Sequence, residues 1–291
     1  MGTSGTFGGS KSGLVPSWVD EPASTPAKAP DGDGDGVPSD GADGADNGGE
    51  TSTPSDPTAY PPMPAVPASS GLGAARGNMT RGARTSDAGA IRRGASQYVG
   101  ASGGGRAAGR RMPNSRAVAG GVAGLARSFV NQGPVEALRR FNLDGMAGAP
   151  AEDVFVALTD VLCPAGGTID EAIARDAMLE TVADLAAAGV GNFDDLSPDD
   201  LREFFIGVVS RSIEGKILNE VGTNAVSVPA DLAGVERAQN MLHDFVEGCV
   251  RDEFETRGTD LGDLEGDVID GFVDDLYAAA LDLVEALGAE E

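Results

Sequence analysis

The sequence predicts an all-α protein whose folded part is an acidic helical bundle. From about residue 114 to the C-terminus, apolar residues recur every three or four positions, as they do in amphipathic helices. No comparable stretch alternates polar and apolar residues with the period of two that a strand would need. Capping residues, such as Thr168 followed by Glu171, indicate where individual helices begin.

Residues 1–70 are expected to be a disordered tail. They are rich in Gly, Ser, Thr, Pro, Ala and Asp, with DGDGDG at 31–36 and YPPMPAVP at 60–67. Such a segment buries too little apolar surface to offset the conformational entropy that folding removes. The compact part is therefore expected in the C-terminal region, over about 160–175 residues, which is enough to bury most of its apolar surface.

Residues 71–113 are predicted to form short, arginine-rich helices. Ala, Gly and Arg dominate this segment, and large apolar residues are sparse. Ser86 and Asp87 could cap a helix that runs through Val99. Each glycine inside a helix costs about 1 kcal/mol relative to alanine, so we expect these helices to be marginal unless they dock on the rest of the protein.

Residues 114–291 carry the helix signals of the bundle. The first predicted helix contains SRAVAGGVAGLARSFV, which places Val118, Val122, Leu125 and Phe129 on one face. The further predicted helices run from Pro134 to about Phe141, over about 151–162, from Thr168 to Gly189, from Ser197 to Gly222, over about 232–257 and over about 265–287.

Charge divides the chain into three bands. Residues 1–70 carry 10 acidic and 2 basic side chains, residues 71–130 carry 1 and 10, and residues 131–291 carry 35 and 9, for a net charge of −25. The acidic body should repel nucleic acid and anionic membranes over a Debye length of about 8 Å. The chain has neither an apolar secretion signal nor 18 consecutive apolar residues, so we expect a cytoplasmic protein without a membrane contact.

The sequence offers few groups for catalysis. His243 is the only histidine, and its neighbours Asp244 and Glu247 favour a solvent-facing or capping role on a helix. Cys163 and Cys249 fall within apolar helical patterns, which favours buried thiols over nucleophiles, disulfide partners or zinc ligands. We therefore expect no catalytic residue, no metal and no resident cofactor.

The arginine band leaves two interpretations open. It could contact phosphate backbones, with Tyr98 available to stack a base, or it could fold against this chain's own acidic bundle or a partner's acidic surface. The arginines concerned are Arg76, Arg81, Arg84, Arg92, Arg93, Arg106, Arg110, Arg111 and Arg116.

The first ten residues suit insertion into a narrow pocket. They carry no charged side chain and little bulk, and Gly2 follows Met1 directly. Removal of Met1 would expose an unhindered α-amine, a group whose pKa is about 7.7 to 8.0.

Five short motifs occur in an order that resembles the QatB family, components of the Qat anti-phage defence systems of bacteria and archaea. The motifs are MGTSGTFGG, LVPSWVDEP, SSGLGAARGNMTRGAR, IRRGASQYVGASGGGRAAGRRM and AVAGGVAGLARSF. The resemblance is strong over residues 2–20 and 70–130 and diffuse over the helical remainder.

The resemblance implies a non-catalytic protein encoded beside an ATPase, a QueC-like enzyme and a TatD-like nuclease. Enzymes similar to QueC adenylate the carboxylate of a 7-deazaguanine and normally pass it to ammonia. In the defence systems the resemblance implies that the deazaguanine is conjugated to a protein N-terminus instead. Here the acceptor would be the Gly2 amine, with Thr3 and Ser4 entering the partner's site.

The resemblance also suggests a role for LVPSW at residues 14–18, which includes the only tryptophan. Leu14, Val15, Pro16 and Trp18 would form a docking motif that holds the tail on the QueC-like partner. The alternative is that Trp18 folds back onto the helical bundle of its own chain.

Overall fold

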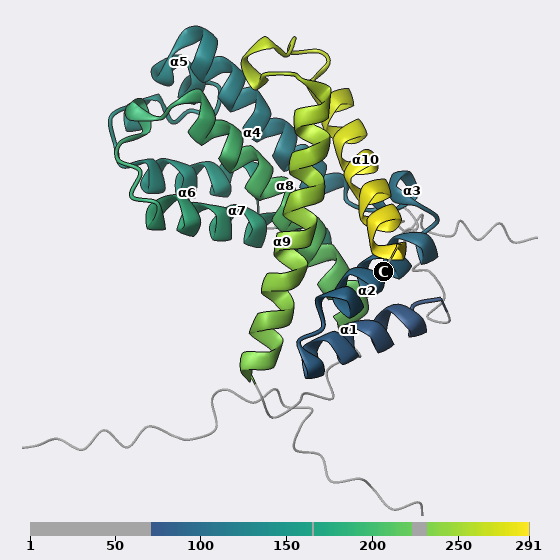
Figure 1. Cartoon of the computed structure of the whole chain (residues 1–291). Coiled ribbons are helices and arrows are strands. Elements are labelled where there is room, and N and C mark those ends of the chain that lie inside the picture. The colour runs from purple at the N-terminus through teal and green to yellow at the C-terminus, as the bar shows by residue number, and fades with distance from the viewer. Residues whose placement is uncertain (1–70, 165, 223–231, 291) are drawn as a thin grey trace, which may run out of the picture. The chain divides into compact units, whose positions relative to one another are not determined.

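The computed structural model describes residues 71–164, 166–222 and 232–290, and their regular structure is helical throughout, without a strand (Figure 1). This confirms the all-α prediction for these ranges. In chain order the α-helices are α1 (Gly73–Thr85), α2 (Ala88–Ala101), α3 (Gly105–Gly109), α4 (Pro113–Gln132), α5 (Pro134–Arg139), α6 (Ala151–Leu162), α7 (Ile169–Ala187), α8 (Pro198–Gly222), α9 (Leu232–Arg257) and α10 (Ile269–Ala289).

The arginine-rich segment forms α1, α2 and α3. Asp87 caps α2 as expected, because its carboxylate accepts a hydrogen bond from the backbone N–H of Ala90 at 3.1 Å. α1 and α2 approach each other closely at Met79 of α1 and Gly94 of α2. A Cβ atom at Gly94 would lie 2.8 Å from Cγ of Met79. α2 packs against α9 and α10, so these glycine-rich helices are docked rather than isolated (Figure 1).

Local capping places the middle helices close to their predicted bounds. α7 begins with the expected capping box, in which the Thr168 hydroxyl accepts from the Glu171 N–H and the Glu171 carboxylate accepts from the Thr168 N–H. The helix stops just before Gly189, which adopts a φ of +75°. α5 ends at Arg139, two residues before its expected end.

The prediction for the last helix was wrong at its start. Helix α10 begins at Ile269 rather than near residue 265, and a short 3₁₀ helix, Leu261–Asp263, precedes it. The carboxylate of Asp260 accepts from the backbone N–H of Gly262, and Leu261 and Leu264 are buried. The chain is thus packed against the protein at these two leucines before α10 starts.

Helix α8 lies at the centre of the packing, in contact with α4, α7 and α9. Aromatic residues fill one side of it: Phe204 stacks on Phe155 with ring centroids 4.0 Å apart, and Phe193 meets Phe155 edge-on. Two turns further along α8, Ser212 lies against Tyr277 of α10, which is fully buried and whose hydroxyl is 2.7 Å from that of Ser212. None of the described helices is both long and apolar enough to cross a bilayer.

Candidate functional site

The tail residues singled out in the sequence lie outside the residues that the structure describes. These are Gly2, Thr3, Ser4, Leu14, Val15, Pro16 and Trp18. The arginine band, by contrast, is described from Arg76 onward.

Glu220, near the C-terminal end of α8, receives part of the arginine band. Arg111 approaches its carboxylate at 3.6 Å, and Lys216 pairs with the same carboxylate at 2.9 Å. Arg76 of α1 donates to the backbone carbonyl of Glu220 at 3.3 Å. The side chains of Arg111 and Glu220 are both less than one-fifth exposed, so this contact ties the arginine-rich segment to the bundle.

Helix α10 supplies a second set of acidic partners. Arg106 pairs with Asp275 at 3.8 Å, Arg116 pairs with Asp274, and the backbone N–H of Gly105 donates to Asp282 at 2.7 Å. These contacts place α3 and the start of α4 against the acidic face of α10.

The remaining arginines of the band differ in their contacts. Arg81 and Arg93 lie 4.0 Å and 3.7 Å from the carboxylate of Asp87, and the guanidinium of Arg92 lies 5.6 Å from the centre of the Phe245 ring. Arg84 and Arg110 are exposed and pair with no other residue in the described part of the chain.

Much of the positive charge of the band is thus neutralised by this chain's own acidic residues. That arrangement favours the interpretation in which the band folds against its own bundle. The nucleic-acid alternative depends mainly on Arg84 and Arg110, which are unpaired among the described residues, and on the exposed Arg81 and Arg106, which is a small footprint for tracking a phosphate backbone.

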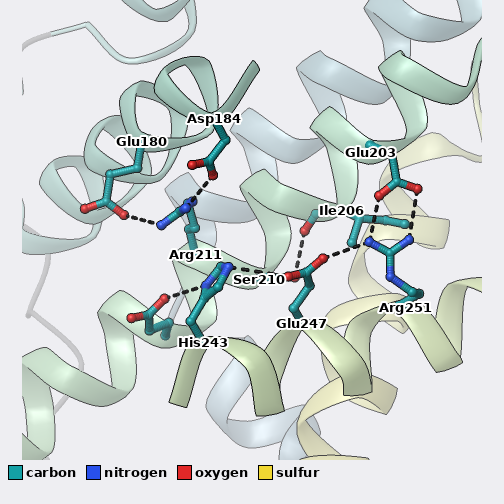
Figure 2. A network of polar contacts seen from close by, with 10 residues as sticks. Glu180, Asp184, Glu203, Ile206, Ser210, Arg211, His243, Glu247 and Arg251 are labelled. Carbon is teal, nitrogen blue, oxygen red and sulfur yellow. Dashed lines mark hydrogen bonds and ion pairs between the residues drawn. The ribbon is translucent and has the colours of Figure 1, made fainter. Parts of the chain in front are cut away.

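A chain of charged contacts joins α7, α8 and α9 (Figure 2). Arg211 of α8 points toward α7, where it pairs with Glu180 at 2.9 Å and with Asp184. Arg251 of α9 donates two hydrogen bonds to Glu203 of α8, at 2.6 Å and 2.9 Å, and a third to Glu247 at 2.7 Å.

His243 occupies the middle of this network rather than facing solvent or capping a helix. Its Nδ1 lies 2.9 Å from the Glu214 carboxylate and its Nε2 lies 3.4 Å from that of Glu247. The hydrogen bond with Glu214 raises the pKa of His243, burial opposes that rise, and the negative charges of Glu214 and Glu247 add to it. These contacts favour the protonated form of the imidazole, which can act as a cation between the two carboxylates.

The sequence contained part of the signal for this network. His243, Glu247 and Arg251 are spaced four residues apart on one helix face, which is the spacing of helical ion pairs. Glu214 and Glu203 come from another helix, and nothing in their local sequence indicates these partners. Residues of this network, Arg211 and His243 among them, line a cavity of about 300 Å³ between α7, α8 and α9.

Both cysteine thiols are buried and free. Burial raises the pKa of Cys163 to about 11 and that of Cys249 to about 12. The thiolate, which is the nucleophilic form, is therefore scarce at neutral pH. Among the described residues, no group of three or more His, Cys, Asp or Glu side chains is arranged to hold a metal ion.

Comparison with known proteins identifies one family. The family model described as "Qat anti-phage system associated protein QatB" matches residues 103–284, more than half of the chain. No curated protein and no solved structure matches the chain. The matched region runs from the loop before α3 into α10 and so covers most of the helical part. The chain belongs to the QatB family and is a component of a Qat anti-phage system.

Proposed function

We propose that this QatB-family chain is a non-catalytic component of its defence complex, and that its N-terminal amine accepts a deazaguanine from a QueC-like partner enzyme. The observation that carries the proposal is the start of the chain, MGTSGTFGGSKSGLVPSW, in a member of this family. It combines a small residue after Met1, an uncharged and slender first segment, and a separate apolar motif.

The proposed reaction is the aminolysis of an acyl adenylate. The partner uses ATP to adenylate the carboxylate of a 7-deazaguanine and releases pyrophosphate. The nitrogen of the Gly2 amine then attacks the acyl carbon, so that an amide C–N bond forms and the C–O bond to AMP breaks. AMP leaves with the electron pair of that bond, and the amine loses a proton to solvent or to a base of the partner.

The docking motif would supply the affinity that the slender first residues lack. Complete burial of a large apolar side chain contributes about 1.5–3 kcal/mol before ordering costs, and Leu14, Val15 and Trp18 are three such residues. Pro16 limits the conformations that the motif must lose on binding. The residues between Gly2 and Leu14 span at most roughly 40 Å, so a docked motif would hold the amine near the site at about millimolar effective concentration.

The described helices support a binding role for the body of the protein. The groups best suited to nucleophilic or acid–base chemistry are engaged elsewhere, because Cys163 and Cys249 are buried with raised pKa values and His243 is held between two carboxylates. Free, buried thiols suit a reducing compartment, so the proposal places the complex in the cytoplasm. The ATPase and the TatD-like nuclease of the same system are its other proposed partners.

Intact-mass analysis after co-expression with the QueC-like partner tests the acceptor role. The expected result is a deazaguanine adduct on the peptide that begins with Gly2, and its absence when the partner is omitted. A Gly2→Leu variant, which retains Met1 because its second residue is bulky, should carry no adduct. An unmodified Gly2 amine in the presence of an active partner contradicts the proposal.

Binding of a labelled peptide of residues 2–20 to the purified partner tests the docking motif. Trp18→Ala should weaken binding about tenfold or more, because 1.4 kcal/mol corresponds to a factor of ten. In the full chain, Tyr60→Ala removes another aromatic residue of the tail outside the motif and should leave partner binding unchanged. Equal affinities of the wild-type and Trp18→Ala peptides would remove the docking role.

A further inference from the structure

A groove of about 600 Å³ lies between α2, α9 and α10. Its apolar surface comes from Met241 and Phe245 of α9, which are partly buried, and from Leu287 of α10, which is 39% exposed. Carboxylates border it at Asp244 and Asp252 of α9 and at Glu290 of α10.

The two faces of α9 differ in how their acidic residues are used. On the face toward α8, Glu247 is hydrogen-bonded to Arg251 and lies against His243. On the groove side, Asp244 and Asp252 are exposed and have no ion-pair partner among the described residues. One face is therefore neutralised within the protein, and the other presents unpaired negative charge beside apolar surface.

Gly248 is an exposed residue that lines the groove. It lies in the interior of the 26-residue helix α9, where glycine is less favourable than alanine. Apart from its chain neighbours and the nearby backbone of its own helix, no described heavy atom lies within 4 Å of the position that its Cβ would occupy, and no positive φ requires glycine there. The α9 backbone is therefore open at this point of the groove, and another chain can approach it closely without a clash at this residue.

We propose that this groove is a docking site for a basic amphipathic helix of another protein. Met241 and Asp252 are eleven residues apart, so the groove extends for roughly 16 Å along α9, or about three turns of a bound helix. The apolar residues of that helix lie on Met241, Phe245 and Leu287, and its lysines or arginines meet the carboxylates at the border.

One end of the groove is bordered by the contact between Arg92 and Phe245. The Arg92 guanidinium lies over the Phe245 ring at 5.6 Å, so a cation from α2 already occupies one end of the aromatic surface. A second copy of this chain fits poorly, because residues 131–291 carry 35 acidic and 9 basic side chains and like charges would face each other. This site lies on the helical body and is separate from the tail contacts of the proposed function.

Fluorescence anisotropy of a labelled probe peptide tests the proposal on the full chain. The probe is a 14-residue helix with leucines on one face and lysines on the other, and its counterpart carries glutamates in place of the lysines. Two variants form a matched pair: Gly248→Leu adds a side chain inside the groove, and Gly271→Leu adds one at an equally open position near the start of α10. Neither changes the net charge, and thermal unfolding verifies that both fold.

The expected result is saturable binding of the lysine peptide, at least tenfold weaker binding to Gly248→Leu, and unchanged binding to Gly271→Leu. The glutamate peptide should bind at least tenfold more weakly than the lysine peptide to the unaltered chain. The proposal would be overturned if all three proteins bound the lysine peptide with equal affinity, or if both variants lost affinity equally. It would also be overturned if the glutamate peptide bound as tightly as the lysine peptide.

Discussion

Raising the pH should loosen the packing of α9 on α8, because His243 loses the proton that its carboxylate partners stabilise. The pKa of His243 is raised in the folded protein, so its contribution to stability is fully present below the unfolded pKa of about 6.5 and is lost as pH rises through the folded value. The charges around the imidazole are Glu214 and Arg211 of α8 and Glu247 of α9.

The size of this effect follows from the two contacts of the imidazole. Hydrogen bonds to charged groups contribute about 1.5–3 kcal/mol, but the His243 side chain is 21% exposed and Glu247 is shared with Arg251. We therefore expect about 1–2 kcal/mol in total. For a folded part of this size, roughly 2–4 °C of melting temperature accompanies each kcal/mol, so the shift should be about 2–8 °C.

Urea unfolding of the wild type and of His243→Gln between pH 6 and pH 9 measures the contribution. Glutamine retains a hydrogen-bonding amide but cannot carry the charge, so the variant should be less stable than the wild type at pH 6. The difference should shrink steadily toward pH 9. A difference that stays constant across this range would show that His243 acts through its shape and neutral hydrogen bonds, and would refute the electrostatic reasoning.

Two further predictions concern the attachment of the arginine-rich segment and the state of the cysteines. Glu220→Gln should lower the free energy of unfolding by about 1–3 kcal/mol and increase hydrogen exchange in α3 and in the turn after it, since it removes the charge that Arg111 and Lys216 share. The control Glu136→Gln breaks an exposed ion pair with Arg139, one helical turn away, and should change the free energy of unfolding by less than about 0.5 kcal/mol. Similar losses in both variants would contradict the role of Glu220 in attaching the arginine-rich segment. Cys163 and Cys249 should resist iodoacetamide at pH 8 in the folded chain and react fully in denaturant, as measured by mass; rapid alkylation of either native thiol would contradict the burial that raises its pKa.

Helix positions could be predicted where the determinants are local. Asp87 caps α2, Thr168 and Glu171 form the capping box of α7, and Pro198 occupies the first position of α8, all within one turn of the helix that each begins. The start of α10 could not be predicted in this way. Leu261 and Leu264 before it are buried, and the 3₁₀ helix that contains Leu261 packs against α4, which is distant in the sequence.

The candidate site was predictable to a smaller extent, because its contacts join residues far apart in the chain. The spacing of His243, Glu247 and Arg251 indicates a charged helix face, but the partner Glu214 lies 29 residues before His243 on another helix. Arg111 and Glu220 are likewise brought together only by the packing of the arginine-rich segment on α8. The sequence consequently left open whether the arginine band meets its own chain or a partner.

Because the arginine band pairs largely with its own chain, the charge on the surface of the protein differs from what the sequence suggests. Residues 71–130 carry a formal excess of nine positive charges, yet Arg106, Arg111 and Arg116 are turned toward Asp275, Glu220 and Asp274 of the same chain. Positive charge that is paired within the chain attracts an acidic ligand less strongly. The exposed charge on the described helices is therefore mainly that of carboxylates. Electrostatic steering by such a surface favours basic partners and weakens as salt is added. The described helical body is therefore suited to contacts with cationic surfaces.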